Sequence, residues 1–310
     1  LSFVAKLADP DINKKMDTKK VIKFLADKLK SEVMDDHFSH LPNTWVGPVM
    51  NHLENVWMPG VLGYDLYSGR IGPGVALALA SKILNEKKYS DITFQMFNSS
   101  ANILEEKKYE IRNLLVAGVG LFSGYTSILW GLNEAGKVME KEEWCQLARE
   151  SFSIIDKELA TVDDNFFDMI SGKSAPIIFR HKIDKEYRLS KEQLDKYIVA
   201  GEKLLENRGE KTTIGLAHGL CHIIWFFSVL NQIYFDEKVV QLVRKTDEVI
   251  KSEFVTYDGE FIVYEGEKEH FVSSSWCNGL SGILLSYYEG FRAGIFERED
   301  VSEIISKLVT

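Results

Sequence analysis

Apolar and polar positions follow one another along this chain in blocks of helix length. Three polar stretches carry apolar residues at three- and four-residue steps, which is the spacing of one face of an amphipathic helix. They are "KEEWCQLARESFSIIDKELA", "SKEQLDKYIVAGEKLLEN" and "DEKVVQLVRKTDEVIKSEF". Other stretches, such as "HIIWFFSVL", are apolar on nearly every side and predict buried helices. Strand signals are weak: "GEFIVYEGE" predicts a short hairpin, and no long alternating segment stands out.

A short phrase introduces each apolar stretch and occurs five times. In each copy a small or polar residue precedes a glycine, and an apolar, helix-like run follows within a few residues. The pairs are Ser68-Gly69, Ser123-Gly124, Ser171-Gly172, His218-Gly219 and Asn278-Gly279. The glycines are 55, 48, 47 and 60 residues apart, which leaves room for two helices per repeat. We therefore predict an all-α protein, an α/α toroid in which buried inner helices form a ring and outer helices surround it.

The phrase also predicts where a functional site would lie. A polar side chain just before a helix can cap free N–H groups, and glycine lets neighbouring backbones approach closely. If the inner helices run in one direction, their amino ends meet at one mouth and collect partial positive charge. Such a mouth suits an anion, a thiolate or a developing enolate. The residues expected to line it are Asp65, Asp168, His218, Trp276 and Cys277.

Composition narrows the class of protein and its partners. The formal net charge of −9 disfavours nucleic acid as a partner, because an acidic surface repels phosphate. The longest apolar runs are about half the ~18 residues that a membrane span needs. Three cysteines without a close pair do not form a disulfide framework, and Cys145 fits the core face of an outer helix. A reducing cytoplasm is the simplest location.

Several of these motifs together resemble the lanthionine cyclase family. They are "WVG" at Trp45, "DLYSG" ending at Gly69, "GLAHG" at His218 and "SWCNGLSG" around Cys277. Their order and spacing are most similar to the C-terminal cyclase domain of class II lanthipeptide synthetases. On this resemblance residues 17–310 form the cyclase domain, and residues 1–16 are the tail of a linker from an upstream dehydratase domain. The resemblance also implies a bacterial cytoplasmic enzyme.

What the resemblance implies for chemistry is specific. Family members bind one zinc ion through a cysteine and a later Cys-His pair, and a substrate thiolate takes the open position. That thiolate adds to dehydroalanine or dehydrobutyrine in a dehydrated precursor peptide and closes a thioether ring. Carried over to this chain, Cys277 is the first zinc ligand, His218 the acid or base, and Asp168 the orienting or proton-transferring carboxylate. Trp276 and Asn278 flank the cysteine and are expected to contact the peptide.

The chain departs from the family pattern after Cys277. No Cys or His follows that residue, so the Cys-His pair is absent from the sequence. We therefore expect the domain to be incomplete at its C-terminal side and to lack its last repeat. A rewired zinc site is the weak alternative: His218 and His222 lie one helical turn apart and could join Cys277. Core packing is the more ordinary role for His222.

Two other functions remain open at this stage. A catalytically inactive toroid that binds a peptide or a partner domain would explain the missing ligands and the loss of some glycines. A carbohydrate-active barrel would use a pair of carboxylates, with Asp65 and Asp168 as the candidates, but it leaves "WCNG" unexplained. For Asp65 we favour a structural role.

Overall fold

A computed structural model describes seven ranges of the chain. They are residues 17–36, 41–51, 56–105, 118–209, 212–256, 259–265 and 268–309. The linker predicted for residues 1–16 lies outside them. The described residues form two compact units, one with residues up to 105 and Ile128–Ala148, the other with residues 118–127 and 149–309. Each unit is described by itself, and closure of the helices into a ring remains a prediction.

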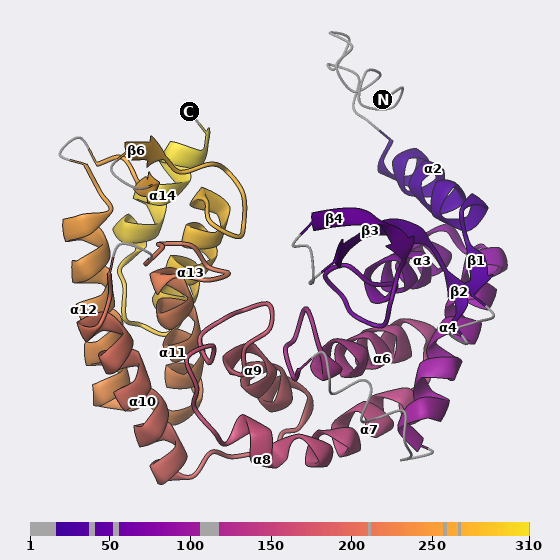
Figure 1. The fold of residues 1–310 in the computed structure, drawn as a ribbon, viewed down its shortest axis with the longest axis horizontal. Helices are drawn as coiled ribbons and strands as arrows, with labels where there is room; N and C mark the ends of the chain where they lie inside the picture. Colours follow the sequence, from indigo (N-terminus) through magenta and orange to yellow (C-terminus); the bar gives the residue numbers. More distant parts are fainter. Residues whose placement is uncertain are drawn as a thin grey trace, which may run out of the picture. The chain divides into compact units, whose positions relative to one another are not determined.

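The first unit combines helices with two hairpins (Figure 1). Its helices are α2 (Thr18–Ser31), α3 (Ile71–Leu84), α4 (Lys87–Glu105) and most of α6 (Tyr125–Met139) and α7 (Glu142–Glu150). A Cβ added at Gly74 of α3 would lie 1.9 Å from Met96 Cε, so glycine allows α3 to pack closely on α4. Arg70 is fully buried before α3 and donates to the Pro42 carbonyl at 2.7 Å.

These hairpins correct the all-α prediction. Strand β1 (Met34–Asp36) pairs with β2 (Leu41–Thr44), and β3 (Val46–Asn51) pairs with β4 (Val56–Val61), both antiparallel. The strands are three to six residues long, and β4 is exposed along nearly its whole length, including Trp57 at 52%. Without one buried face there is no period-two alternation, and the sequence carries no strand signal. The hairpin predicted around residue 262 is confirmed as β5 (Ile262–Glu265) and β6 (Lys268–Phe271).

The second unit shows the predicted alternation of buried and half-buried helices. After η1 (Ser151–Ile154) and α8 (Asp156–Leu159) come six longer helices. They are α9 (Ser174–Ile183), α10 (Lys191–Glu206), α11 (Leu220–Tyr234), α12 (Glu237–Glu253), α13 (Leu280–Arg292) and α14 (Arg298–Val309). Helix α11 is buried on nearly every side and packs against α9, α12 and α13. Helices α10 and α12 lie side by side and bury one face each (Figure 1).

Each inner helix begins directly after its glycine phrase, and the glycine is required by space. A Cβ at Gly69, Gly172, Gly219 or Gly279 would lie 2.1–2.3 Å from a backbone carbonyl oxygen of its own loop. Real Cβ atoms do not approach so closely, so each loop can fold tightly onto its helix only with glycine there.

The predicted side-chain caps are wrong. Helices α3, α9, α11 and α13 have no side-chain hydrogen bond at their N-caps. Carbonyl groups of the folded-back loop take this role: Leu220 N–H donates to Thr213 O, and Leu280 N–H donates to Ser273 O. Within the described ranges, no helix is long and apolar enough to cross a membrane.

Candidate functional site

The phrase loops of the second unit are joined in sequence by backbone hydrogen bonds. The Ile170 carbonyl accepts from Ser123 N–H at 2.9 Å. Met169 N–H donates to the Ala217 carbonyl at 2.8 Å, and Ala217 N–H donates to the Cys277 carbonyl at 2.9 Å. Four consecutive loops therefore lie edge to edge. This arrangement places Asp168, His218 and Cys277 in neighbouring loops, although 50 or more residues separate them along the chain.

Asp168 is held by its own loop. One carboxylate oxygen, Oδ1, accepts from the backbone N–H groups of Ile170 and Ser171 and from the Ser171 hydroxyl. Asp65 makes the same contact with Ser68, three residues further on, at 2.6 Å. The structural role expected for Asp65 thus has a geometric basis. In Asp168 the same turn leaves the second oxygen free to point at another loop.

That second oxygen, Oδ2, pairs with His218 Nδ1. Since the carboxylate only accepts, Nδ1 carries the proton, and Nε2 is the ring nitrogen left for another contact. The Asp168 side chain is 15% exposed, whereas that of His218 is 46% exposed. His218 also lines a hollow of about 590 Å³ together with Phe167 and Leu204. The pair therefore has a half-buried orienting member and an accessible imidazole.

The contact between His218 and Asp168 shifts the pKa of both side chains. The hydrogen bond to Asp168 raises the pKa of His218 above its ordinary 6.5, against the opposing effect of partial burial. Burial acts to raise the pKa of Asp168, but the hydrogen bonds from His218 and Ser171 outweigh it and hold the pKa below 3.8. The carboxylate is ionised at neutral pH, and a larger share of the imidazole is protonated than in a free histidine. His218 is accordingly suited to donate a proton.

Replacing Asp168 with asparagine is expected to lower the pKa of His218 to 6.5 or below. The variant loses the charge and the strong acceptor that raise this pKa, while partial burial still lowers it. The measurement is an NMR titration of the His218 ring protons in both proteins. An unchanged pKa in Asp168→Asn would contradict the assigned pair.

The same shifts give the pair a defined pH window of stability. Because the pKa of His218 is higher in the folded protein, the protonated imidazole stabilises the fold, and this contribution is complete below pH 6.5. It is lost as the pH rises through the pKa of His218 in the folded protein. The lowered carboxyl pKa contributes above 3.8 and is lost as the pH falls through its folded value. Between pH 3.8 and pH 6.5 both contributions to stability are fully present.

Cys277 lies in the fourth loop with its neighbours packed around it. Its thiol is free and half-buried, and burial raises its pKa. Trp276 stacks on Phe122 with ring centres 5.3 Å apart and packs against a small apolar cluster built on Met169, Ala175 and Leu216. Asn278 lies so close to Gly215 that a Cβ there would be 2.3 Å from Asn278 Oδ1. Trp276 and Asn278 thus fix the loop in place, and their contact with a peptide remains a prediction.

His222 serves the core. It is fully buried, with Nδ1 3.2 Å from the Leu216 carbonyl and Nε2 2.6 Å from the Ser174 hydroxyl. The carbonyl can only accept, so Nδ1–H donates and the lone pair of Nε2 accepts from Ser174. Burial lowers the pKa of His222 to about 4 and keeps it neutral. Both ring nitrogens are occupied, which leaves no lone pair for the weak alternative zinc site. Cys145 is also buried, as expected.

The zinc expected from the resemblance needs more ligands than the described residues bring together. No group of three or more His, Cys, Asp or Glu side chains within the described ranges could hold a metal ion. Catalytic zinc is ordinarily held by three protein ligands, and Cys277 supplies one. The donor set found here therefore does not fit zinc.

Comparison with known proteins settles the family. The sequence pattern described as "Lanthionine synthetase C-like protein" matches residues 60–310. The chain belongs to the lanthionine synthetase C-like family. A comparison with curated proteins finds no match.

A solved structure supports the fold of this LanC-like chain. Nisin cyclase is similar with a TM-score of 0.52 and 18% sequence identity, over 79% of this chain and 68% of that one. At this identity the likeness concerns the fold alone. The family and the mostly helical fold predicted from the sequence are thereby confirmed, whereas the specific likeness to a class II synthetase domain stays a prediction.

Sequence reasoning missed two residues of the site. Ser171 supports Asp168 through its backbone and hydroxyl, and Phe122 carries the Trp276 ring. The first had a signal: "DLYSG" and "DMISG" share an Asp three residues before a Ser, the spacing at which the carboxylate accepts the serine N–H. The second had none, because Phe122 and Trp276 lie in repeats far apart in the chain.

Proposed function

We propose that this LanC-like chain is a cyclase that forms lanthionine or methyllanthionine rings in a dehydrated precursor peptide. The observation that supports this most is the His218–Asp168 pair, whose loop is hydrogen-bonded to the loop of Cys277. An accessible imidazole of raised pKa, oriented by a half-buried carboxylate, is the arrangement that general acid catalysis uses. An upstream dehydratase domain and a bacterial cytoplasmic setting belong to the same proposal.

The proposed reaction needs one proton transfer from the protein. The sulfur of a peptide cysteine, having lost its proton to solvent, bonds to the β-carbon of dehydroalanine or dehydrobutyrine. The electron pair of the carbon–carbon double bond moves onto the α-carbon and its carbonyl as an enolate. Protonated His218 then gives its Nε2 proton to the α-carbon and recovers one from solvent. Asp168 keeps the ring oriented and stabilises its charged form.

The zinc-assisted form of this reaction is what the family resemblance implies. It would require ligands besides Cys277, and no step above depends on the metal. Cys277 is itself a poor nucleophile, because burial raises its thiol pKa and keeps it protonated. The reactivity of its thiol therefore plays no part in the proposed step.

Ring closure is a direct test of this function. A synthetic peptide with one dehydroalanine and one cysteine four residues away is incubated with the 310-residue chain, with and without added zinc chloride. Because closure does not change the peptide mass, it is measured as loss of the thiol that N-ethylmaleimide would label. We expect faster thiol loss with the protein than without it. No acceleration in either arm would refute the proposal.

The incomplete donor set favours a second candidate, a LanC-like module that binds a peptide or a partner without catalysis. It predicts binding of the dehydrated peptide with no effect on thiol loss, so the same experiment separates the two. The carbohydrate-active alternative is not retained. It needs two free carboxyl groups across a cleft, whereas both oxygens of Asp168 are engaged and Asp65 accepts from Ser68 in its own turn.

A further inference from the structure

Three adjoining hollows connect His218 with the outer face of helix α10. The inner hollow contains His218 and Gly219 and shares Phe167, Leu204, Asn207 and Thr212 with a middle hollow of about 410 Å³. The middle hollow shares Val162, Ala200 and Lys203 with an outer hollow of about 920 Å³. The three hollows adjoin one another at these shared residues, and we call them together the α10 groove.

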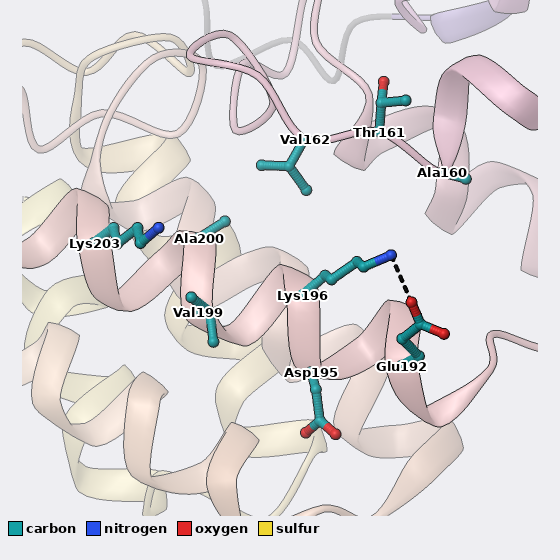
Figure 2. Close-up of a pocket in the computed structure, with 9 residues that line it drawn as sticks. All are labelled: Ala160, Thr161, Val162, Glu192, Asp195, Lys196, Val199, Ala200 and Lys203. Atoms are coloured by element: carbon teal, nitrogen blue, oxygen red, sulfur yellow. Dashed lines mark ion pairs between the residues drawn. The ribbon is translucent and has the colours of Figure 1, made fainter.

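One face of α10 forms the floor of this groove. Its lining residues are Glu192, Asp195, Lys196, Val199, Ala200, Lys203 and Leu204. At 100° per residue these positions fall within an arc of about 180°, while the opposite face buries Leu194, Tyr197 and Leu205 in the core. The segment from Ala160 to Asp164 forms the facing wall. Figure 2 shows Val162 opposite Ala200 and Val199 across the outer hollow.

Apolar side chains in the groove are open to a ligand. Val199 is 46% exposed on α10, and Val162 is 40% exposed on the wall. Ala200 lies beside them and leaves room above the helix (Figure 2). A side chain of moderate size that covered these three residues would remove apolar surface from water on both partners.

Most charges along the groove are already paired, and Lys203 is the exception among the basic residues. Lys196 pairs with Glu192 at 2.8 Å, as the dashed line in Figure 2 marks, and Arg208 pairs with Glu253. Lys203 is exposed, lies where the outer and middle hollows meet, and has no ion-pair partner within the described ranges. It is therefore placed to receive a carboxylate from a ligand.

We propose that the α10 groove binds an extended segment of the same peptide substrate, outside the residues that form the ring. One apolar side chain of this segment covers Val162, Val199 and Ala200, and a Glu or Asp side chain pairs with Lys203. The inference rests on the proposed function for the identity of the ligand, because the groove begins at His218. From Glu192 to Asn207 the floor is about 22 Å long, which matches roughly seven extended residues.

Peptides of two lengths test this proposal. The short one carries only a dehydroalanine, a cysteine and the residues between them, with a fluorescein label. The long ones add seven residues that include Leu and Glu, at either the amino or the carboxyl end. Fluorescence anisotropy with the 310-residue chain should show at least tenfold tighter binding for one of the long peptides. Val199→Glu and Lys203→Glu should remove this gain and leave binding of the short peptide unchanged.

A charge exchange makes the test specific. Replacing Glu by Lys in the extension should weaken binding to the natural chain and restore it to Lys203→Glu. Lys182→Glu, an equal charge reversal on exposed surface outside the groove, is the matched control and should keep the full gain. Equal binding of short and long peptides, or a gain that survives both groove variants, would overturn the proposal. Thiol loss is followed separately, so tighter binding without ring closure would refute the cyclase and leave the groove intact.

Discussion

Replacement of His218 by alanine is expected to slow ring closure by about 10²–10⁴-fold, the usual contribution of a positioned acid or base. The variant removes the Nε2 proton donor and leaves Asp168 with its turn contacts to Ile170 and Ser171. The enolate formed by sulfur addition must then wait for a proton from water. Because His218 is 46% exposed, the variant should fold normally. The measurement is the rate of thiol loss in the dehydrated peptide.

A matched control is available in His270, an exposed histidine of the same unit in strand β6. His270→Ala should close rings at the rate of the natural chain. The rate of the natural chain should stop rising as the pH passes through the raised pKa of His218, because loss of the proton donor there offsets the growing share of peptide thiolate. A His218→Ala variant that keeps the full rate would remove His218 from the mechanism. A rate of the natural chain that keeps rising with the thiolate share through this pKa would do the same.

The helical repeat could be predicted from the sequence because local packing requires the same residue pattern in each copy. Each inner helix follows a glycine, because a Cβ at that position would clash with the backbone of its own loop. The cause of the recurring glycine therefore lies within about ten residues of it in the sequence. The amphipathic outer helices carry a periodic signal, since one face of α10 and α12 is buried. Hairpin β3–β4 has no such face, and its exposed Trp57 and Met58 gave no alternation to detect.

The candidate site could be predicted from the sequence only in part. His218 and Asp168 could be nominated from motifs, but their contact depends on the backbone bond between Met169 and Ala217, which pairs two loops about 50 residues apart. No local pattern encodes such a bond. The side-chain caps were wrong for a similar reason: the loop folds back so far that the carbonyl of Thr213 reaches the first turn of α11. A backbone carbonyl of the closed loop therefore takes the place of the predicted side-chain cap.

Replacement of Gly219 by alanine is expected to destabilise the second unit by about 3 kcal/mol or more, an effect in the upper range of single substitutions. The added Cβ would lie 2.2 Å from the Thr213 carbonyl oxygen and 2.6 Å from Gly215 N, and both of these are backbone atoms. A flexible side chain could turn away, whereas a backbone can yield only if the loop opens. Opening would break the bond from Leu220 N–H to Thr213 O and shift the loop that carries His218.

The origin of this cost can be isolated, because the backbone of Gly219 has φ −134° and ψ −167°, an extended conformation that any residue adopts. Conformational strain is therefore excluded, and only the lack of space remains. Gly209 of the same unit is the matched control, since a Cβ there meets nothing within 4 Å. Gly209→Ala should be neutral or slightly stabilising, by up to about 1 kcal/mol. Thermal unfolding should show a Tm about 10 °C lower for Gly219→Ala. Equal Tm values for the two variants would mean that the loop does not close on α11 as described, and the position of His218 would lose its support.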